Sequence, residues 1–323
     1  MKSIRFGVLM RTMSTRGHYP SDDWVEKVQN LEKLGYSSLL ISDHFNNQWE
    51  PIATAAAVAS VTRQLKVGPL VMCVDFRPPV VLAQAAATLH LISKGRCEFG
   101  FGAGWTKAEY DQAGIQFDSP AVRINRLEET LVAVRQMWTE EKSSYSGNHI
   151  HLSGIGWPTQ LPEGERPKIT VGGGGRKLLS MAGRHADIVS IVPSWPKGRI
   201  VEKSTSDQTS SMIRKKAEWV KASAESAGRD PSEIELSTVH WQMRMTDSRD
   251  EALKEYAKMY GISFDVLTNT PFFLVGTPED IREEIINLNE LTGISYFVVP
   301  GSMDDFKNLE QFSSLVIRPI TGN

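Results

Sequence analysis

The sequence predicts an α/β fold, a single-domain (β/α)8 TIM barrel with loop insertions that spans residues 1–323. Short apolar runs alternate with amphipathic stretches roughly eight times along the chain. Most of these runs are apolar throughout, as in parallel strands covered on both faces. A chain of 323 residues with 41% hydrophobic content can also bury a large core without disulfides. A doubly wound parallel sheet remains the alternative, because strands and helices alternate in both folds.

The expected strands are short runs rich in β-branched and other apolar residues. They fall at 4–10, 38–41, 65–72, 97–101, 169–171, 188–192, 234–245 and 296–299. Residues 145–151 alternate in character and predict a small hairpin inserted between two barrel units. Residues 193–209 are polar and predict a loop rather than a linker between domains, because the composition does not change across them.

The expected helices follow the strands in order and carry start and stop signals. They fall at 22–34, 52–61, 79–92, 120–138, 177–184, a stretch ending at 227, 250–259, 278–291 and a last helix after 304. We expect Ser21 to cap the first helix and Gly35 to end it. Pro79 and Pro278 stand where a first helical turn accepts proline, since that position has no hydrogen bond to lose.

Composition excludes several functional classes. The 36 Lys and Arg residues against 38 Asp and Glu give a net charge of −2, so neither nucleic acid nor an anionic membrane is an expected partner. The two cysteines, Cys73 and Cys97, do not form a disulfide framework and suggest a reducing compartment. No Cys and His spacing suits a metal, and no run is apolar and long enough for a membrane span. We therefore expect a soluble, cytoplasmic protein without a metal site.

His44 is the leading candidate for catalysis, because it follows the second strand. In a parallel barrel, the chemistry lies where the strands end. An imidazole can exchange a proton near neutral pH while another group moves a hydride. Asp43 could orient His44 or bind a cofactor hydroxyl. A purely structural His–Asp pair is the alternative.

Two glycine runs end other strands. Gly172, Gly173, Gly174 and Gly175 precede a basic helix start, where bare N–H groups and the helix dipole favour a phosphate; a flexible turn is the alternative. Gly102, Ala103 and Gly104 follow the fourth strand without the spacing of a dinucleotide fingerprint. They would let a flat ligand approach the backbone.

Tryptophans in predicted loops are candidates for an apolar substrate pocket. Trp49 follows the second strand, Trp105 follows the fourth, and Trp157 and Trp195 lie in later loops. Each indole could line a pocket or simply seal a loop against a helix.

Several motifs together resemble those of one family. They are Asp43-His44-Phe45, Phe76-Arg77-Pro78-Pro79, the stretch 99–105 with Gly102-Ala103-Gly104-Trp105, the glycines at 172–175, and Gly276-Thr277-Pro278-Glu279. This set resembles the luciferase-like monooxygenase superfamily over nearly the whole chain. Within it, Ser42-Asp43-His44 resembles the branch that uses the deazaflavin coenzyme F420.

The resemblance implies a role for each matching position. His44 would face C5 of the coenzyme as proton donor or acceptor, and Asp43 would bind the tricyclic ring or its side chain. A non-prolyl cis peptide near Leu70 and Val71 would support the ring, and the glycines at 172–175 would hold the phosphate. The sugar-phosphate dehydrogenase branch has a catalytic Glu where Trp105 stands here, so a sugar phosphate is not the expected substrate.

The sequence therefore predicts a coenzyme F420-dependent oxidoreductase. It would transfer a hydride between deazaflavin C5 and a small, fairly apolar organic substrate, reducing a C=C, C=N or C=O bond or acting in reverse. An FMN-dependent monooxygenase is the nearest alternative, since the same barrel serves both chemistries. A non-catalytic ligand-binding barrel is the other. Relatives in the superfamily often dimerise through helices near the second and third strands, so the resemblance also implies a homodimer.

Overall fold

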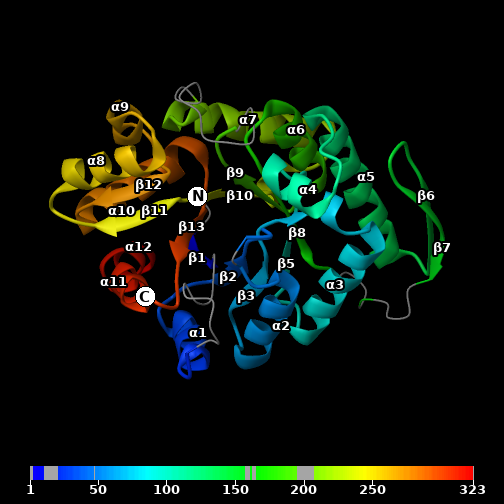
Figure 1. Ribbon diagram of the computed structural model, residues 1–323, viewed down its shortest axis with the longest axis horizontal. Helices are drawn as coiled ribbons and strands as arrows, with labels where there is room; N and C mark the ends of the chain where they lie inside the picture. Colours follow the sequence, from blue (N-terminus) through cyan, green and yellow to red (C-terminus); the bar gives the residue numbers. More distant parts are fainter. Residues whose placement is uncertain are drawn as a thin grey trace.

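The structure, a computed structural model, describes residues 3–10, 21–46, 48–156, 161, 165–194 and 207–322. It confirms the predicted parallel barrel with surrounding helices (Figure 1). The barrel strands are β1 (Arg5–Met10), β2 (Ser38–Ile41), β3 (Lys66–Pro69), β4 (Met72–Cys73), β5 (Glu98–Gly102), β8 (Lys168–Gly173), β9 (Ile188–Ile191), β10 (Glu235–Val239) and β13 (Tyr296–Gly301).

These nine strands form one parallel sheet in the order β3-β2-β1-β13-β10-β9-β8-β5-β4. β3 and β4 are two pieces of the third barrel strand, separated by Leu70 and Val71. The sheet closes because β4 pairs with β5 and Val67 of β3 bridges Cys97. The nine pieces therefore occupy the eight strand positions of a (β/α)8 barrel.

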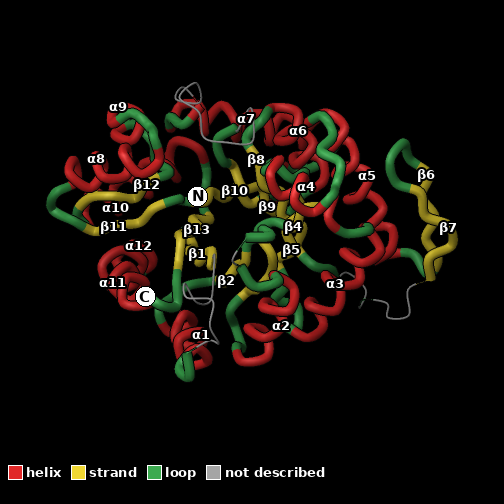
Figure 2. Tube along the Cα trace, viewed as in Figure 1, coloured by secondary structure: helices red, strands yellow, loops and turns green. Residues whose placement is uncertain are grey.

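Helices cover the outside of the barrel (Figure 2). They are α1 (Trp24–Lys33), α2 (Pro51–Val61), α3 (Pro79–Ile92), α5 (Pro120–Thr139), α6 (Arg176–His185), α7 (Ser210–Ser226), α10 (Pro278–Thr292), α11 (Phe306–Phe312) and α12 (Arg318–Thr321). A single 3-10 turn, η1 (Val74–Phe76), follows β4, a second, η3 (Pro231–Glu233), precedes β10, and a π-helical turn, η4 (Ser313–Ile317), joins α11 to α12. No helix within the described ranges is long and apolar enough to cross a membrane.

Two sets of elements extend the barrel. The predicted hairpin is confirmed as β6 (Lys142–Ser146) and β7 (His151–Gly156), an antiparallel ribbon beyond α5 at one side of the molecule (Figure 1). Between β10 and β13 the chain forms β11 (Gln242–Met245), α8 (Arg249–Tyr260), α9 (Phe264–Thr268) and β12 (Phe273–Gly276) before α10. β11 and β12 pair in a separate two-stranded sheet.

The apolar core has two compartments, because side chains alternate between the two faces of a strand. Phe6 and Val8 of β1 belong to the large cluster shared with the helices, which lies outside the barrel wall. Leu9 belongs instead to a small cluster with Leu40, Ile188, Tyr296 and Val298. The small cluster therefore fills the barrel interior.

A polar cluster fills the barrel at the amino ends of the strands. Arg5 pairs with Glu235 at 2.6 Å and with Glu98 at 3.0 Å, and its guanidinium lies 3.4 Å from the ring centre of Tyr296. The Tyr296 hydroxyl also lies 3.2 Å from Glu98. The buried charges are thus paired, as burial requires.

Three sequence predictions of local structure are wrong. The strand expected at 234–245 is two strands, and β11 leaves the barrel after Val239. The first helix is capped at Asp23 rather than Ser21, with no side-chain cap bond. The strand expected at 65–72 is broken at Leu70–Val71. Sequence reasoning also missed α9, β12 and the short helix α4 (Lys107–Ala113).

Candidate active site

The predicted site residues follow the carboxyl ends of three barrel strands. His44 comes after β2, Trp105 comes after β5, and the glycine run begins in β8. Carboxyl ends of parallel strands meet at one rim of the barrel. The structure brings two of the candidates into contact, since the rings of His44 and Trp105 lie 6.0 Å apart at an interplanar angle of 89°.

His44 forms a pair with a carboxylate that sequence reasoning missed. Its Nδ1 lies 2.8 Å from Oε1 of Glu109, which stands in the first turn of α4. The two side chains are 25% and 11% exposed. With the carboxylate oxygen as the acceptor, Nδ1 is the donor in this pair. Nε2 has no hydrogen-bond partner among the described residues, and it is left to exchange a proton.

Of the two roles left open for Asp43, its contacts do not support the one of orienting His44. Its carboxylate accepts two bonds from Arg77, at 2.9 and 3.1 Å, and a third from the N–H of Cys73 at 2.9 Å. The Asp43 side chain is only 2% exposed. Asp43 therefore ties the end of β2 to the end of β4, and it leaves the orientation of His44 to Glu109. A contact between Asp43 and a cofactor stays a prediction.

The non-prolyl cis peptide lies where the resemblance placed it, between Leu70 and Val71. The Val71 side chain lies against β5. A Cβ atom at Gly100 would come within 2.6 Å of Val71 Cγ1, and one at Gly102 within 2.4 Å of Val71 Cγ2. These glycines make room for Val71, which gives them a role in packing.

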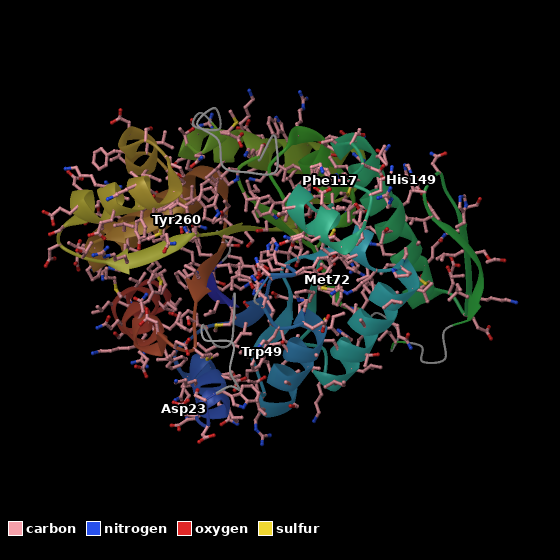
Figure 3. The ribbon with its side chains drawn as sticks, in the orientation of Figure 1. Asp23, Trp49, Met72, Phe117, His149 and Tyr260 are labelled. Carbon is pink, nitrogen blue, oxygen red and sulfur yellow. The ribbon has the colours of Figure 1, made fainter. Side chains whose placement is uncertain are left out.

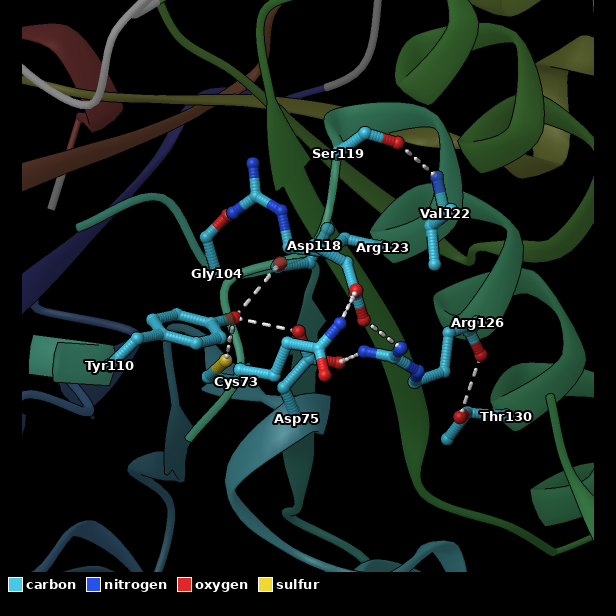
Figure 4. A network of polar contacts seen from close by, with 12 residues as sticks. Cys73, Asp75, Gly104, Tyr110, Asp118, Ser119, Val122, Arg123, Arg126 and Thr130 are labelled. Atoms are coloured by element: carbon cyan, nitrogen blue, oxygen red, sulfur yellow. Dashed lines mark hydrogen bonds and ion pairs between the residues drawn. The ribbon is translucent and has the colours of Figure 1, made fainter. Parts of the chain in front are cut away.

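Gly104 also has a packing role. Its φ is +68°, a region that side chains other than glycine rarely adopt, and a Cβ there would come within 2.0 Å of the Tyr110 hydroxyl. Figure 4 shows the polar contacts around this point. The Gly104 carbonyl accepts from Arg123 at 2.8 Å, and Ala103, next to it, is nearly buried. Any contact of Gly102, Ala103 or Gly104 with a cofactor stays a prediction.

The four glycines that begin in β8 and end at the start of α6 are not equivalent. A Cβ at Gly172 would meet only ordinary contacts, with Val71 at 3.6 Å and Ser190 at 3.8 Å. A Cβ at Gly173 would clash with Leu178, and one at Gly174 with the backbone of residues 192–194. Gly175 has open space in that direction and is the N-cap of α6.

The N-terminus of α6 is consistent with an anion site. No side chain caps it, so the first N–H groups of the helix are not satisfied by a cap. The helix dipole adds a partial positive charge at this end. The open space at Gly175 leaves room for a ligand there.

Aromatic side chains stand at the rim beside His44. Trp105 is 44% exposed, and Phe45, named in the sequence analysis only as part of a motif, is 46% exposed and stacks on Phe76 with ring centres 4.4 Å apart. Trp49 is half-buried and packs against the large core near the start of α2 (Figure 3), and its place in a substrate pocket stays a prediction. Trp157 and Trp195 lie outside the described residues.

Comparison with known proteins places the chain in a family. A family model described as luciferase-like monooxygenase matches residues 4–271. The chain is 30% identical over 222 residues to a 5,10-methylenetetrahydromethanopterin reductase of Methanolobus tindarius, covering 68% of this chain and 61% of that protein. It is 26% identical over 329 residues to an F420-dependent glucose-6-phosphate dehydrogenase of Intrasporangium calvum, covering 92% and 94%. The chain spans about three fifths of the length of that reductase and about half of the length of several other curated relatives it matches.

Solved structures share the fold. An F420-dependent secondary alcohol dehydrogenase, solved with an F420–acetone adduct, superposes with a TM-score of 0.80 at 20% identity over 99% of both chains. The coenzyme F420-dependent tetrahydromethanopterin reductase of Methanopyrus kandleri superposes with a TM-score of 0.76 at 19% identity, over 98% of this chain and 99% of that one. At these identities the likeness establishes the barrel and its extensions. Since the family model spans most of the chain, this protein belongs to the luciferase-like monooxygenase family.

Proposed function

We propose that this protein is a coenzyme F420-dependent oxidoreductase acting on a small, uncharged and fairly apolar substrate. The observation that carries the proposal is the His44–Glu109 pair, which leaves one ring nitrogen of His44 without a partner among the described residues, beside the exposed Trp105. The F420-dependent relatives named above support the choice of cofactor.

Two features at the start of α6 support a site for the anionic part of such a cofactor. The uncapped N-terminus of α6 and the open space at Gly175 fit a phosphate. Lys177 lies in the first turn of α6, and its Nζ donates to Oδ1 of Asn125 at 2.7 Å. His44 and the cis peptide at Leu70–Val71 would hold the ring. When bound, the deazaflavin supplies or accepts the hydride.

His44 donates the proton to the substrate or accepts it from the substrate. The Glu109 carboxylate accepts the Nδ1 hydrogen, which orients the ring and stabilises the imidazolium when Nε2 gains a proton. In substrate reduction, protonated His44 donates from Nε2. In the reverse direction, neutral His44 accepts the hydroxyl proton at the same atom. The same geometry therefore serves both directions.

The charges around the site favour an uncharged substrate. Arg77 is engaged by Asp43, Arg123 by the Gly104 carbonyl, and Arg126 by Asp75. None of these three guanidiniums is left without an acceptor to attract a substrate phosphate. The exposed faces of Trp105 and Phe45 instead offer apolar contact.

Binding measurements test the cofactor. Purified protein is titrated separately with coenzyme F420 and with FMN, and fluorescence reports binding. We expect micromolar or tighter binding of F420 and at least tenfold weaker binding of FMN. A preference for FMN would favour the monooxygenase alternative, supported by the family itself, and oxygen consumption would then be measured.

Substitutions at the pair test the chemistry. His44→Ala and Glu109→Gln are expected to lower kcat by about 100-fold or more, the usual contribution of a general acid or base, while F420 affinity changes little. His151→Ala, on the exposed hairpin strand β7, is the matched control and should keep wild-type turnover. Wild-type turnover in His44→Ala with full cofactor occupancy would refute the role of His44 in proton transfer, whereas a wild type that binds ligand without any turnover would favour the non-catalytic ligand-binding barrel.

We also propose that the protein forms a homodimer through α2 and α3, which pack side by side. On α3, Val81 is 46% and Ile92 is 49% exposed. These residues lie on one helix face, since eleven residues make about three turns. Light scattering should give a dimer mass for wild type and a monomer mass for Ile92→Glu. A monomeric wild type would overturn this interface.

A further inference from the structure

Glu109 stands on a helix that has little to hold it in place by itself. α4 has only seven residues, and its N-cap Thr106 makes no side-chain cap bond. Helices this short are marginal in water, so contacts with the rest of the protein must set their position. The ion pair between Lys107 and Asp111 is exposed and contributes little.

Tyr110, the residue after Glu109, supplies the contact that anchors α4. It is fully buried, and its ring packs against Phe76 and Phe117, with centroid distances of 5.1 and 4.8 Å. Its hydroxyl lies 2.8 Å from Asp75 Oδ2 and 3.1 Å from Cys73 Sγ (Figure 4). The side chain therefore reaches from α4 to the end of the third barrel strand.

The acceptor of that hydroxyl is itself held rigidly. The Asp75 side chain is 1% exposed, and its Oδ1 accepts from Arg126 of α5 at 2.7 Å. Arg126 also bonds Asp118. The Tyr110 hydroxyl donates its single hydrogen to Oδ2 of this carboxylate. Burial raises the pKa of the Cys73 thiol to about 12, and the protonated thiol can then donate to the Tyr110 oxygen.

We propose that Tyr110 is a positioning residue for the His44–Glu109 pair, because its hydroxyl fixes α4 to Asp75 at the register that brings Glu109 to His44. Neighbouring residues on a helix point about 100° apart. Tyr110 can therefore point into the barrel wall while Glu109 points along the rim. The proposal rests on the proposed function of the pair. It adds Tyr110, a fully buried residue, which would act on the reaction only through Glu109.

Tyr110→Phe tests the proposal, because it keeps the ring contacts and removes only the hydroxyl. The matched control is Tyr36→Phe, which also removes a buried hydroxyl, one that donates to the Leu309 carbonyl at 3.0 Å on another part of the barrel. Both variants should lose similar thermal stability. Only Tyr110→Phe should lower kcat by tenfold or more and shift the pH–rate profile, with F420 affinity within twofold of wild type.

A second readout does not depend on turnover. The ¹⁵N chemical shifts of the His44 ring report which nitrogen carries the hydrogen. Wild type and Tyr36→Phe should show the Nδ1–H form, whereas Tyr110→Phe and Glu109→Gln should show a mixture of both forms. If Tyr110→Phe does not fold, Arg126→Gln loosens the same anchor from α5 and should give the same mixture.

The outcomes separate the two proposals. If His44→Ala abolishes turnover but Tyr110→Phe keeps wild-type kcat and the Nδ1–H form, the positioning role is overturned and the proposed function stands. If wild type shows no F420 turnover but Tyr110→Phe still changes the His44 ring signals, the positioning role stands and the proposed function fails.

Discussion

Replacing Gly174 with alanine should destabilise the protein, whereas the same change at Gly175 should not. A Cβ at Gly174 would lie 2.3 Å from the Val192 carbonyl oxygen and 2.5 Å from both the Pro193 carbonyl carbon and the Ser194 nitrogen. These are backbone atoms, and they are held in place. Val192 accepts from Lys216 at 3.0 Å, and the Ser194 N–H donates to Asp207.

The expected cost follows from that clash. Overpacking a rigid site typically costs about 1–3 kcal/mol. At Gly175 the φ is −82° and the space is open, so alanine fits without strain. Alanine has less conformational freedom than glycine in the unfolded chain, which stabilises the folded protein by about 0.4–1 kcal/mol. The poorer N-cap propensity of alanine offsets this stabilisation. Gly175→Ala should therefore stay within about 0.5 kcal/mol of wild type.

Urea denaturation followed by circular dichroism measures the difference in the free energy of unfolding. For a chain of 323 residues, a change of 1 kcal/mol in the free energy of unfolding corresponds to a shift of about 1.5 °C in Tm. Gly175→Ala should weaken F420 binding despite its normal stability, because its methyl group enters the proposed phosphate space. Equal stability of the two variants would refute the packing argument, and unchanged F420 affinity in Gly175→Ala would refute the location of the phosphate.

Three further predictions concern buried ionisable groups. Burial lowers the pKa of His240 to about 4, so between pH 6.5 and 4 the unfolded chain binds a proton that the folded state does not, and stability falls with falling pH by up to about 3 kcal/mol. Relative to wild type, the unfolding free energy of His240→Asn should therefore decrease as pH rises from 4.5 to 6.5. Burial raises the pKa of Glu284 to about 7, so the stability that its protonated form contributes is fully present below pH 4.5 and is lost as pH rises through 7. Relative to wild type, the unfolding free energy of Glu284→Gln should therefore increase as pH rises from 4.5 to 6.5. Curves of unfolding free energy against pH that run parallel to that of wild type would contradict both pKa assignments. Lys216→Met removes the fully buried ammonium that bonds Asp207 at 2.8 Å. The free energy of unfolding, measured by urea denaturation, should fall by about 2–3 kcal/mol. A loss under 0.5 kcal/mol would show that water solvates Asp207 when the ammonium is absent.

The chain order of the elements could be predicted because its signals are local. Apolar runs of four to six residues and prolines in first helical turns act within a few residues. The Thr277–Asp280 capping box that begins α10 is a further local signal of this kind. The single strand expected at 234–245 failed because both halves have strand character, and only the separate pairing of β11 with β12 divides them.

Proximity to the rim could likewise be predicted for His44 and Trp105, since every parallel strand ends at the same edge. The resemblance also located the cis peptide at Leu70–Val71. The partner of His44 could not be predicted. Glu109 is 65 residues away on a helix too short for periodicity to indicate, whereas Asp43 is the carboxylate adjacent to His44 in the sequence.

The sequence by itself determined the fold class and the rim on which the site lies, because hydrophobic pattern and strand direction follow from residue order. Only the tertiary structure decided how each polar and small residue is used. It paired Glu109 with His44, gave Asp43 to Arg77, and filled the space above Gly102 with Val71. These contacts depend on where separate βα units stand around the closed barrel, and that placement results from the packing of the whole chain.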